Sequence, residues 1–472
     1  SEVGTLVPVR GIVGNNKIVV LVNGMRINPP GGEYVPIRND VSVRHAEQIE
    51  VVYGPGSTLY GEDAIAAVIN IVTARPDPES RGEAGLAAGQ HDTHEGWATI
   101  NTCFGPDDAL HLLVHVRLAD SDLSELDNDY PGWWQGYQAV ARPKESGLDP
   151  AREDRGLNLF ARVGTENNSL QLWHRQSRRS SSEGFNPILG FTPEAVWDDM
   201  TTVVEGMNTW RLADGLSLES RLVYSRYEID PDTRYVFAAS EDEWFLDDYK
   251  YGIGDGMKLE ETIHVDLHPG ISLMAGGAAA TYDITPKATV PGRADPDGDI
   301  GSQAGTFVYF TEPGNPASRR EVPRAVTVRY QTYAAYAEGA WRATDNLKLI
   351  AGVRVTDDSR FDDRPVTPRA SLLWKLTERL TAKYTYAEAY VAPAPYFANA
   401  PFDNGTVIHV PNPDLEPEEA VSHELALHYA GEHISAGASA FYGEQDNLIL
   451  ISEDGSMPET VLNDSVTLEN GS

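Results

Sequence analysis

Residues 54–61 read GPGSTLYG, and such a run of glycine, serine and threonine is typical of loops that bind phosphate or carry a nucleophile. A phosphate loop needs the pattern GxxxxGK[ST]. Here Gly61 is followed by Glu62 and Asp63, whose carboxylates would repel a phosphate. A nucleophile elbow needs GxSxG, and Ser57 directly follows Gly56, so that pattern fails as well. The segment predicts neither chemistry, and we expect it to turn the chain between two buried strands.

Three acidic or histidine-containing segments could bind metal ions. One offers transition-metal ligands and two offer the carboxylate oxygens that calcium prefers. The sets are His91, Asp92, His94 and Glu95; Asp295, Asp297 and Asp299; and Glu241, Asp242, Glu243, Asp247 and Asp248. Their spacing departs from the EF-hand pattern, and solvated, charged loops explain them better than metal binding does, so we predict no metal site. No Ser/His/Asp set or carboxylate pair can be assembled from spacing, so the sequence makes no case for an enzyme.

An aromatic patch lies in the first long polar segment, formed by Tyr130, Trp133, Trp134 and Tyr137. Two interpretations remain open. The rings could stack on a flat ligand, or they could lie in the headgroup layer of a membrane.

Composition narrows the class of protein. The chain has 472 residues, with 71 Asp and Glu against 37 Lys and Arg, and a formal charge of −34. Such a field repels phosphate backbones, so nucleic acid is excluded as an expected partner. Cys103 is the single cysteine, so no internal disulfide can form. No apolar run approaches the roughly 18 residues of a spanning helix, so the chain is either soluble or crosses a membrane by strands.

Two regions of different character must position these segments. Residues 1–76 contain short apolar runs at 17–22, 48–52 and 64–73, each bounded by Gly, Asn or Pro, which is typical of a small α/β domain. A polar linker follows at 77–82. From residue 83 to 472, segments of about ten residues alternate apolar and polar side chains, as strands with two different faces do.

The connectors of the second region also alternate. We expect about fifteen strands, including 111–119, 216–227, 332–341, 347–355, 380–390, 422–429, 434–442 and 447–452. Short turns at 105–109, 165–168, 214–215, 269–270, 344–346, 377–379 and 431–432 separate longer connectors near 120–156, 178–201, 228–256, 284–326, 358–366 and 391–420. Outer-membrane barrels sort their loops this way. Recurring aromatics are expected to form interface belts, namely Trp97, Trp173, Trp210, Tyr224, Trp341, Trp374 and Tyr390.

Two stretches far apart carry a family resemblance. Residues 8–73 contain PVRGIVGNNKIVVLVNGMRIN and AEQIEVVYGPGSTLYGEDAIAAVINIVT, which resemble the plug domain of TonB-dependent outer-membrane receptors. The plug signature includes Gly54, Pro55, Gly56, Leu59, Tyr60 and Gly61. Downstream, TPRASLLWKLTERLTAKYTYAEAYVAPAPYF, NPDLEPEEAVSHELALHY and YGEQDNLIL resemble segments of the same family's barrel.

The resemblance implies a transmembrane antiparallel β-barrel of 22 strands, about fifteen of them present, with a small α/β plug inside it. It further implies a receptor and active transporter in the outer membrane of a Gram-negative bacterium, with no cofactor. The expected ligand is scarce: an iron–siderophore, haem or cobalamin. Expected partners are the TonB–ExbB–ExbD complex, through an N-terminal box preceding Ser1, and outer-membrane lipid and lipopolysaccharide. About seven strands are expected beyond Ser472.

Several residues depart from the family pattern. Tyr53 stands where the family has an Arg before Gly-Pro, Gln48 and Val391 also replace arginines, and Ala66 and Ala67 replace a Gly pair. Because that plug Arg commonly pairs with barrel carboxylates, ordinary gating is in doubt. The alternative function is a plugged barrel that no longer transports and serves as a scaffold or surface receptor.

Ligand contacts are expected on the upward plug loops and the inner barrel wall. The candidates are Arg10, Glu33, Tyr34, Trp133 and Trp134. For Arg10, internal pairing with a plug carboxylate is the open alternative.

Overall fold

A computed structural model describes most of the chain. The described residues are 8–12, 14–32, 41–75, 81–122, 131–132, 153–181, 195–237, 246–290, 307–312, 315–323, 325–403, 407–453 and 464–471.

The N-terminal region folds around a four-stranded sheet of order β2-β1-β4-β3. Its elements are η1 (Asn15–Lys17), β1 (Ile18–Val22), β2 (Met25–Arg26), β3 (Ala46–Tyr53), α1 (Ser57–Tyr60) and β4 (Ala67–Thr73). Strand β1 reads IVVLV and is buried along its whole length, in parallel register with β4. The packed side chains of β1 and β4 form the core of this domain, which we call the plug.

Strand β3 differs from the sequence-based prediction. The signature segment does turn the chain from β3 to β4 through the single helical turn α1, but only β4 is largely buried. Strand β3 is the edge strand of the plug sheet, and Ile49 and Val51 are 49% and 42% exposed. An edge strand pairs on one side only, so an apolar sequence does not by itself secure burial.

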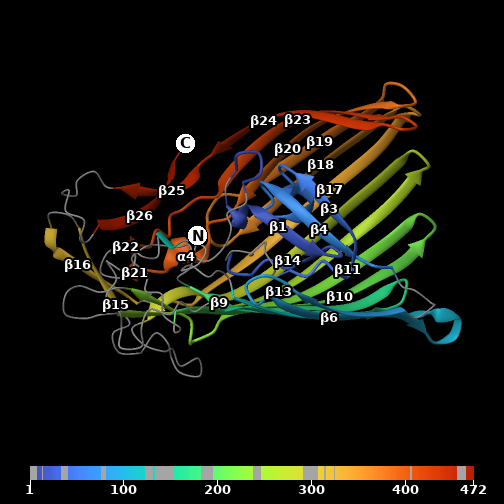
Figure 1. Ribbon diagram of the computed structural model, residues 1–472. Helices are drawn as coiled ribbons and strands as arrows, with labels where there is room; N and C mark the ends of the chain where they lie inside the picture. Colours follow the sequence, from blue (N-terminus) through green and yellow to red (C-terminus); the bar gives the residue numbers. More distant parts are fainter. Residues whose placement is uncertain are drawn as a thin grey trace.

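The second region forms one antiparallel sheet in which 15 strands follow one another within the described residues, with β12 paired to β13 beside them. The strands are β5 (Arg81–Ala88), β6 (His94–Phe104), β7 (Leu110–Asp122), β8 (Glu153–Gly164), β9 (Asn168–Ser180), β10 (Val196–Ala213), β11 (Leu216–Ile229), β12 (Arg234–Phe237), β13 (Leu246–His268), β14 (Ile271–Val290), β17 (Val328–Thr344), β18 (Leu347–Asp358), β19 (Val366–Lys375), β20 (Leu380–Val391), β23 (Glu418–Ala430) and β24 (Ser435–Asp446). This agrees with the prediction of about fifteen strands. Figure 1 shows the large sheet curving around the plug strands.

The two ends of the large sheet carry different connectors, as predicted. One end has tight turns, such as residues 214–215 between β10 and β11, and the 3-10 turn η2 (Pro106–Asp108). The other end has long connectors with small structures of their own (Figure 1), namely β15 (Phe307–Glu312), β16 (Asn315–Pro323), α4 (Pro395–Asn399), β21 (Phe402–Asp403), β22 (Val407–Val410), β25 (Leu448–Glu453) and β26 (Asp464–Gly471). We call these the short-turn end and the long-connector end; the latter faces outside in barrels of this kind.

Several strands run further toward the long-connector end than predicted. Strand β13 begins at Leu246, inside the connector expected at 228–256, and β14 continues to Val290, inside the one expected at 284–326. Backbone pairing continues there although the sequence no longer alternates clearly, because ladder hydrogen bonds need no apolar face. Strand β5 begins at Arg81, within the expected linker at 77–82.

The predicted aromatic belts are partly wrong. Trp210, Trp341 and Trp374 are 55%, 50% and 50% exposed and lie near the short-turn end, and Tyr224 lies toward the other end, as interface belts require. Trp173 and Tyr390 are each only 2% exposed, however, and Trp97 lies against the plug residue Arg44. The alternation of a strand does not say which face meets lipid and which meets the plug.

In the described part of the chain, no register joins β5 to β24, the first and last strands of the large sheet. No helix among the described residues is long and apolar enough to cross a membrane.

Candidate functional site

The part of the plug that faces the long-connector end is built by β2 and the residues after α1. Helix α1 ends at Gly61, whose φ of +81° lets the chain reverse direction and places Glu62 and Asp63 beside the end of β2. There Arg26 Nη2 lies 2.5 Å from Asp63 Oδ2, and Arg26 Nη1 donates to the carbonyl of Glu62 at 3.0 Å. The reversal is therefore held within the plug by one arginine.

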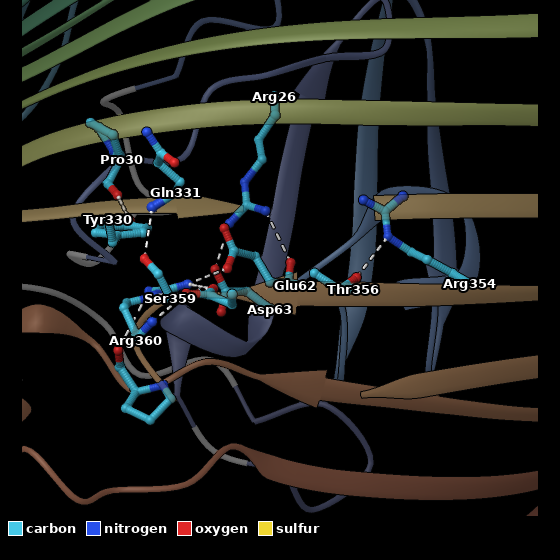
Figure 2. A network of polar contacts seen from close by, with 12 residues as sticks. Arg26, Pro30, Glu62, Asp63, Tyr330, Gln331, Arg354, Thr356, Ser359 and Arg360 are labelled. Carbon is cyan, nitrogen blue, oxygen red and sulfur yellow. Dashed lines mark hydrogen bonds and ion pairs between the residues drawn. The ribbon is translucent and has the colours of Figure 1, made fainter. Parts of the chain in front are cut away.

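A second arginine joins this plug apex to the large sheet (Figure 2). Arg360 lies in the connector between β18 and β19, and its Nη2 atom is 2.6 Å from Glu62 Oε2 and 2.6 Å from Asp358 Oδ2. Its guanidinium carbon lies 4.1 Å from the ring centroid of Tyr330, whose hydroxyl donates to the carbonyl of Pro30 at 2.9 Å. We call these contacts of Arg26, Glu62, Asp63, Arg360 and Tyr330 the apex network.

The two carboxyl groups of the plug in this network have different protonation behaviour. Burial raises the pKa of Asp63 to about 6, and the charge of Arg26 offsets this only in part. Burial also favours the neutral form of Glu62, but the charges of Arg360 and Arg26 outweigh it and hold the pKa of Glu62 below its ordinary value. Glu62 is therefore the ionised partner that carries the contact between plug and sheet.

Two cavities adjoin the apex network. The first, of about 70 Å³, is lined by Arg26, Glu62, Tyr282, Tyr330 and Arg360 among others, and has room for only two or three water molecules at about 30 Å³ each. The second, of about 130 Å³, continues between the plug and the wall of β10 to β18. Its wall side carries paired charges, such as Lys258 with Glu260 at 2.7 Å. Two small cavities with charged lining thus lie beside the plug.

Family models match both regions of the chain. The model "TonB dependent receptor-like, beta-barrel" matches residues 208–466, and "TonB-dependent Receptor Plug Domain" matches residues 2–68. The chain belongs to the TonB-dependent receptor family. This receptor is accordingly an outer-membrane protein of a Gram-negative bacterium, with a plug domain and a β-barrel, as the resemblance implied.

Two curated relatives are similar to most of this receptor. The vitamin B12 transporter BtuB of Vibrio vulnificus is 23% identical over 450 residues, covering 94% of this chain and 61% of that protein. The ferric enterobactin receptor of Pseudomonas aeruginosa is 22% identical over 445 residues, covering 87% and 56%. The receptor chain thus spans about 60% of the length of these relatives.

Solved structures agree in fold. A mutant of the ferric enterobactin receptor PfeA from Pseudomonas aeruginosa matches with a TM-score of 0.71 at 19% identity, covering 98% of this chain and 69% of that one. The copper transporter OprC matches with a TM-score of 0.67 at 16% identity, covering 98% and 67%.

Arg10 lies in a contact between the plug and the large sheet. Its Nη1 atom is 3.1 Å from Glu424 Oε2 on β23, and its guanidinium carbon is 5.5 Å from the Tyr53 ring and 4.5 Å from the Phe441 ring. Its partner is thus a barrel carboxylate, where the open alternative had a plug carboxylate. A cation of the plug therefore pairs with a barrel carboxylate next to Tyr53. Whether Arg10 also contacts a ligand stays a prediction.

The other predicted ligand contacts, Glu33, Tyr34, Trp133 and Trp134, lie outside the described residues. Among the described residues no group of three or more metal-ligand types is assembled, and Glu95 pairs with Arg44 and Arg117. The run at 295–299 and the side chains of the run at 241–248 lie outside the described part.

On the opposite side of the plug, a histidine pair joins it to β7 and β8. His45 is 4% exposed, stacks on His115 with ring centroids 4.6 Å apart and on Phe160 at 5.1 Å, and has no hydrogen-bond partner for either ring nitrogen among the described residues. Nearby, Ser42 Oγ lies 2.8 Å from His115 Nε2. Burial, and then the neighbouring His115, lower the pKa of His45 to about 3.

Sequence reasoning missed the apex network. Glu62 and Asp63 entered the sequence argument only as groups that repel phosphate. Their position, as two adjacent acidic residues directly after the last glycine of the plug signature, could have indicated a charged contact of the plug. Arg360 gave none, because its partner Glu62 is 298 residues away in sequence.

Proposed function

We propose that the full-length protein is a TonB-dependent active transporter that captures a scarce ligand, such as an iron–siderophore, haem or cobalamin, at the outer face of the outer membrane. One observation carries this proposal: Glu62 on the plug pairs with Arg360 in the connector between β18 and β19, at the long-connector end of the sheet. A ligand that enters between the long connectors would meet the plug apex, where this pair and the Tyr330–Pro30 contact lie.

The shared arginine suggests how ligand binding is signalled to the plug. Arg360 divides its donors between Glu62 and Asp358. An anionic oxygen of a ligand would compete with Glu62 for these donors. Loss of the Glu62 contact would remove an ion pair between plug and sheet, while the Tyr330–Pro30 hydrogen bond and the hydrogen bond from the Asp63 amide to the carbonyl of Tyr390 would stay. Because the adjoining cavity has a volume of only about 70 Å³, far below the roughly 300–1,000 Å³ of small-molecule sites, the ligand would rest on the apex and not inside it.

We retain Arg10, Glu33, Tyr34, Trp133 and Trp134 as proposed ligand contacts. Glu33 and Tyr34 follow the apex segment that includes Pro30, which supports their place near the ligand. Arg10 is engaged with Glu424, so contact with a ligand requires that this pair first be broken.

The proposed energy source is the TonB–ExbB–ExbD complex, acting through an N-terminal box of the full-length protein. We propose the division into a plug at 1–76, a linker at 77–82 and barrel residues from 83 to 472, with the first barrel strand already beginning at Arg81. Outer-membrane lipid and lipopolysaccharide complete the proposed partners.

The alternative function, a plugged barrel that serves as a scaffold or surface receptor, rests on Tyr53 in place of an arginine. The Arg10–Glu424 pair supports the transporter instead, because it restores a charged plug–sheet contact next to Tyr53.

The test measures binding and uptake by the full-length protein in native outer membranes with a panel of ferric siderophores, haem, cobalamin and copper chelates. We expect one member to bind, and its uptake to require TonB. Glu62→Gln should tighten that binding, because it removes the competitor for Arg360, and should weaken its coupling to uptake, while Glu50→Gln, on the exposed edge strand β3, should leave both unchanged. No binding across the panel, together with no crosslinking to TonB, contradicts the transporter and favours the scaffold.

A further inference from the structure

The plug meets the large sheet in two different ways. Toward β7 to β10, plug and sheet share one apolar cluster, to which the sheet contributes four buried side chains, namely Leu113, Phe160, Trp173 and Val203. On another side, the plug faces β11, β13, β14, β17 and β18, which we call the β11–β18 wall. There the edge strand β2 of the plug sheet contributes Arg26 to the lining of both cavities. The plug is therefore packed less closely against the β11–β18 wall than against β7 to β10.

The two cavities adjoin each other along this wall. Five residues line both of them, namely Arg26, Glu62, Val223, Lys258 and Tyr282. Toward the long-connector end, the rings of Tyr282 and Tyr330 stack at 4.6 Å. Further from that end the side chains of the wall become small: Ala278 and Ala334 are direct cross-strand partners, and both line the second cavity, of about 130 Å³. These short side chains leave space between plug and wall.

One arginine in the lining of the second cavity has no acidic partner. Arg354 on β18 is 6% exposed, and its Nε atom donates to Thr356 Oγ1 at 3.3 Å. Figure 2 shows its two terminal amino groups directed away from Thr356. Its guanidinium carbon lies 5.3 Å from the ring centroid of Tyr336, and no carboxylate of the described residues forms an ion pair with it. A buried charge is costly unless it is paired, so Arg354 presents an uncompensated cation to the cavity.

The carboxylates that line the second cavity each pair with a different cation. The pairs are Glu62 with Arg360 at 2.6 Å, Glu260 with Lys258 at 2.7 Å, and Glu205 with Arg221 at 3.6 Å. On the plug side, Gly61 lies against Arg354, since a Cβ added at Gly61 would be 3.4 Å from Arg354 Nη2. The plug thus approaches this guanidinium with backbone. The terminal amino groups of Arg354 can therefore bind an anionic group that enters the cavity.

We propose that the second cavity is an inner binding site for an anionic oxygen group of the transported ligand, with Arg354 as its contact, and that the ligand passes the plug along the β11–β18 wall. The inference rests on the proposed transport function. Arg360 binds the anionic group at the apex, and Arg354 is the next cation open to it. Separating the plug from β7 to β10 would expose apolar surface, whereas the β11–β18 side already has polar cavities. Because the cavity is smaller than the ligand, β2 must move from the wall during passage.

Modification of single cysteines by charged thiol reagents tests the site without knowledge of the ligand. Full-length protein with Cys103→Ser, in intact cells, carries Ala278→Cys in the second cavity or Val203→Cys in the apolar cluster. Rates are compared for an anionic and a cationic methanethiosulfonate, each relative to its rate with a free thiol. We expect Ala278→Cys to react faster than Val203→Cys, and to prefer the anionic reagent about tenfold. Arg354→Gln should remove that preference, whereas Arg379→Gln, in an exposed ion pair at the short-turn end, should keep it.

A second experiment separates passage from capture, with the panel member that binds. Ala334→Phe fills the cavity from the inner face of β17, whereas Ala335→Phe adds the same ring to the outer face. We expect Ala334→Phe to lower the uptake rate about tenfold at unchanged outer binding, and Ala335→Phe to change neither. Arg354→Gln should also slow uptake, and Arg354→Lys should restore part of the rate.

Two outcomes overturn the proposal. One is modification of Val203→Cys as fast as Ala278→Cys, or without preference for the anionic reagent at Ala278→Cys. The other is uptake by Ala334→Phe at the native rate. Absence of uptake by the native protein contradicts the proposed transport function instead, and the cysteine experiment then still decides whether the cavity admits anions.

Discussion

The guanidinium group of Arg10 lies over the ring of Tyr53, with 5.5 Å between the guanidinium carbon and the ring centroid. Arg10 reaches this position with a φ of +52°, and from it pairs with Glu424 on β23. A neutral tyrosine thus occupies the family's arginine position, and a cation from another part of the plug lies on its ring. The plug thus has a charged contact with the sheet beside Tyr53, made by Arg10.

The Arg10 contact should be measurable as local stability. Arg10→Gln removes a partly buried ion pair and a cation–π contact, and should cost about 1–2 kcal/mol in the local opening of residues 8–12 and 54–61. Hydrogen exchange of the full-length protein reports this directly. Arg75→Gln, which removes an exposed pair of 3.5 Å within the plug, is the control and should have little effect.

A charge exchange separates pairing from packing at the same site. Arg10→Glu alone should lower protection more than Arg10→Gln, because it faces Glu424 with a like charge. Combining it with Glu424→Arg should restore part of the protection. If the double variant is as labile as the sum of the single variants, the ion pair contributes nothing and the ring contacts alone hold Arg10.

Most of the fold could be predicted from the sequence. Which face of a strand meets the plug, and which residues the plug contacts, could not. Alternation and the two classes of connector predicted the strands, since both follow from local residue type. Trp173 and Trp210 sit in similar local patterns, yet one packs against the plug and the other is exposed, because the register with neighbouring strands decides the face. Arg10, Glu62 and Arg360 meet partners that only the closed arrangement of plug and sheet brings near.

The His45 contact should make stability depend on pH. Its folded-state pKa of about 3 lies below the ordinary value, so the folded plug holds a neutral ring. The contribution of the neutral ring to the free energy of unfolding is fully present above about pH 6.5 and is lost as pH falls from there toward 3. At pH 5 the loss should be about 2 kcal/mol. Thermal unfolding between pH 7.5 and 4.5 measures it.

The residues around His45 determine which substitution is a suitable control for that experiment. Arg44 and Glu95 pair at 2.5 Å beside it, and His115 stacks on it. His45→Phe keeps the stack but cannot accept a proton, so it should remove part of the acid destabilisation while leaving stability at pH 7.5 nearly unchanged. An identical pH profile for this variant and the native protein would show that other groups cause the acid sensitivity.

Removing the Glu62 carboxylate should loosen the plug apex. In Glu62→Gln, Arg360 keeps Asp358 as a charged partner, so the cost should be about 2 kcal/mol, below the 3–5 kcal/mol of a buried ion left unpaired. Hydrogen exchange at residues 61–66 should increase while that of β7 and β8 stays unchanged. If residues 61–66 exchange at the same rate in the variant and in the native protein, the Glu62–Arg360 pair does not hold the apex.

Replacing Gly54 of the plug signature should lower stability for a backbone reason. Its φ of +82° is disfavoured for residues with a side chain, and an added Cβ would lie 3.5 Å from Arg10 Nη1, an ordinary contact that adds no clash. Gly54→Ala should therefore cost about 1–2 kcal/mol from backbone strain alone. Gly54→Asn should cost less, because asparagine tolerates this conformation. Gly156→Ala on β8, where an added Cβ meets nothing within 4 Å, is the control. Equal unfolding temperatures for the Ala and Asn variants would show that crowding and not backbone strain sets the cost.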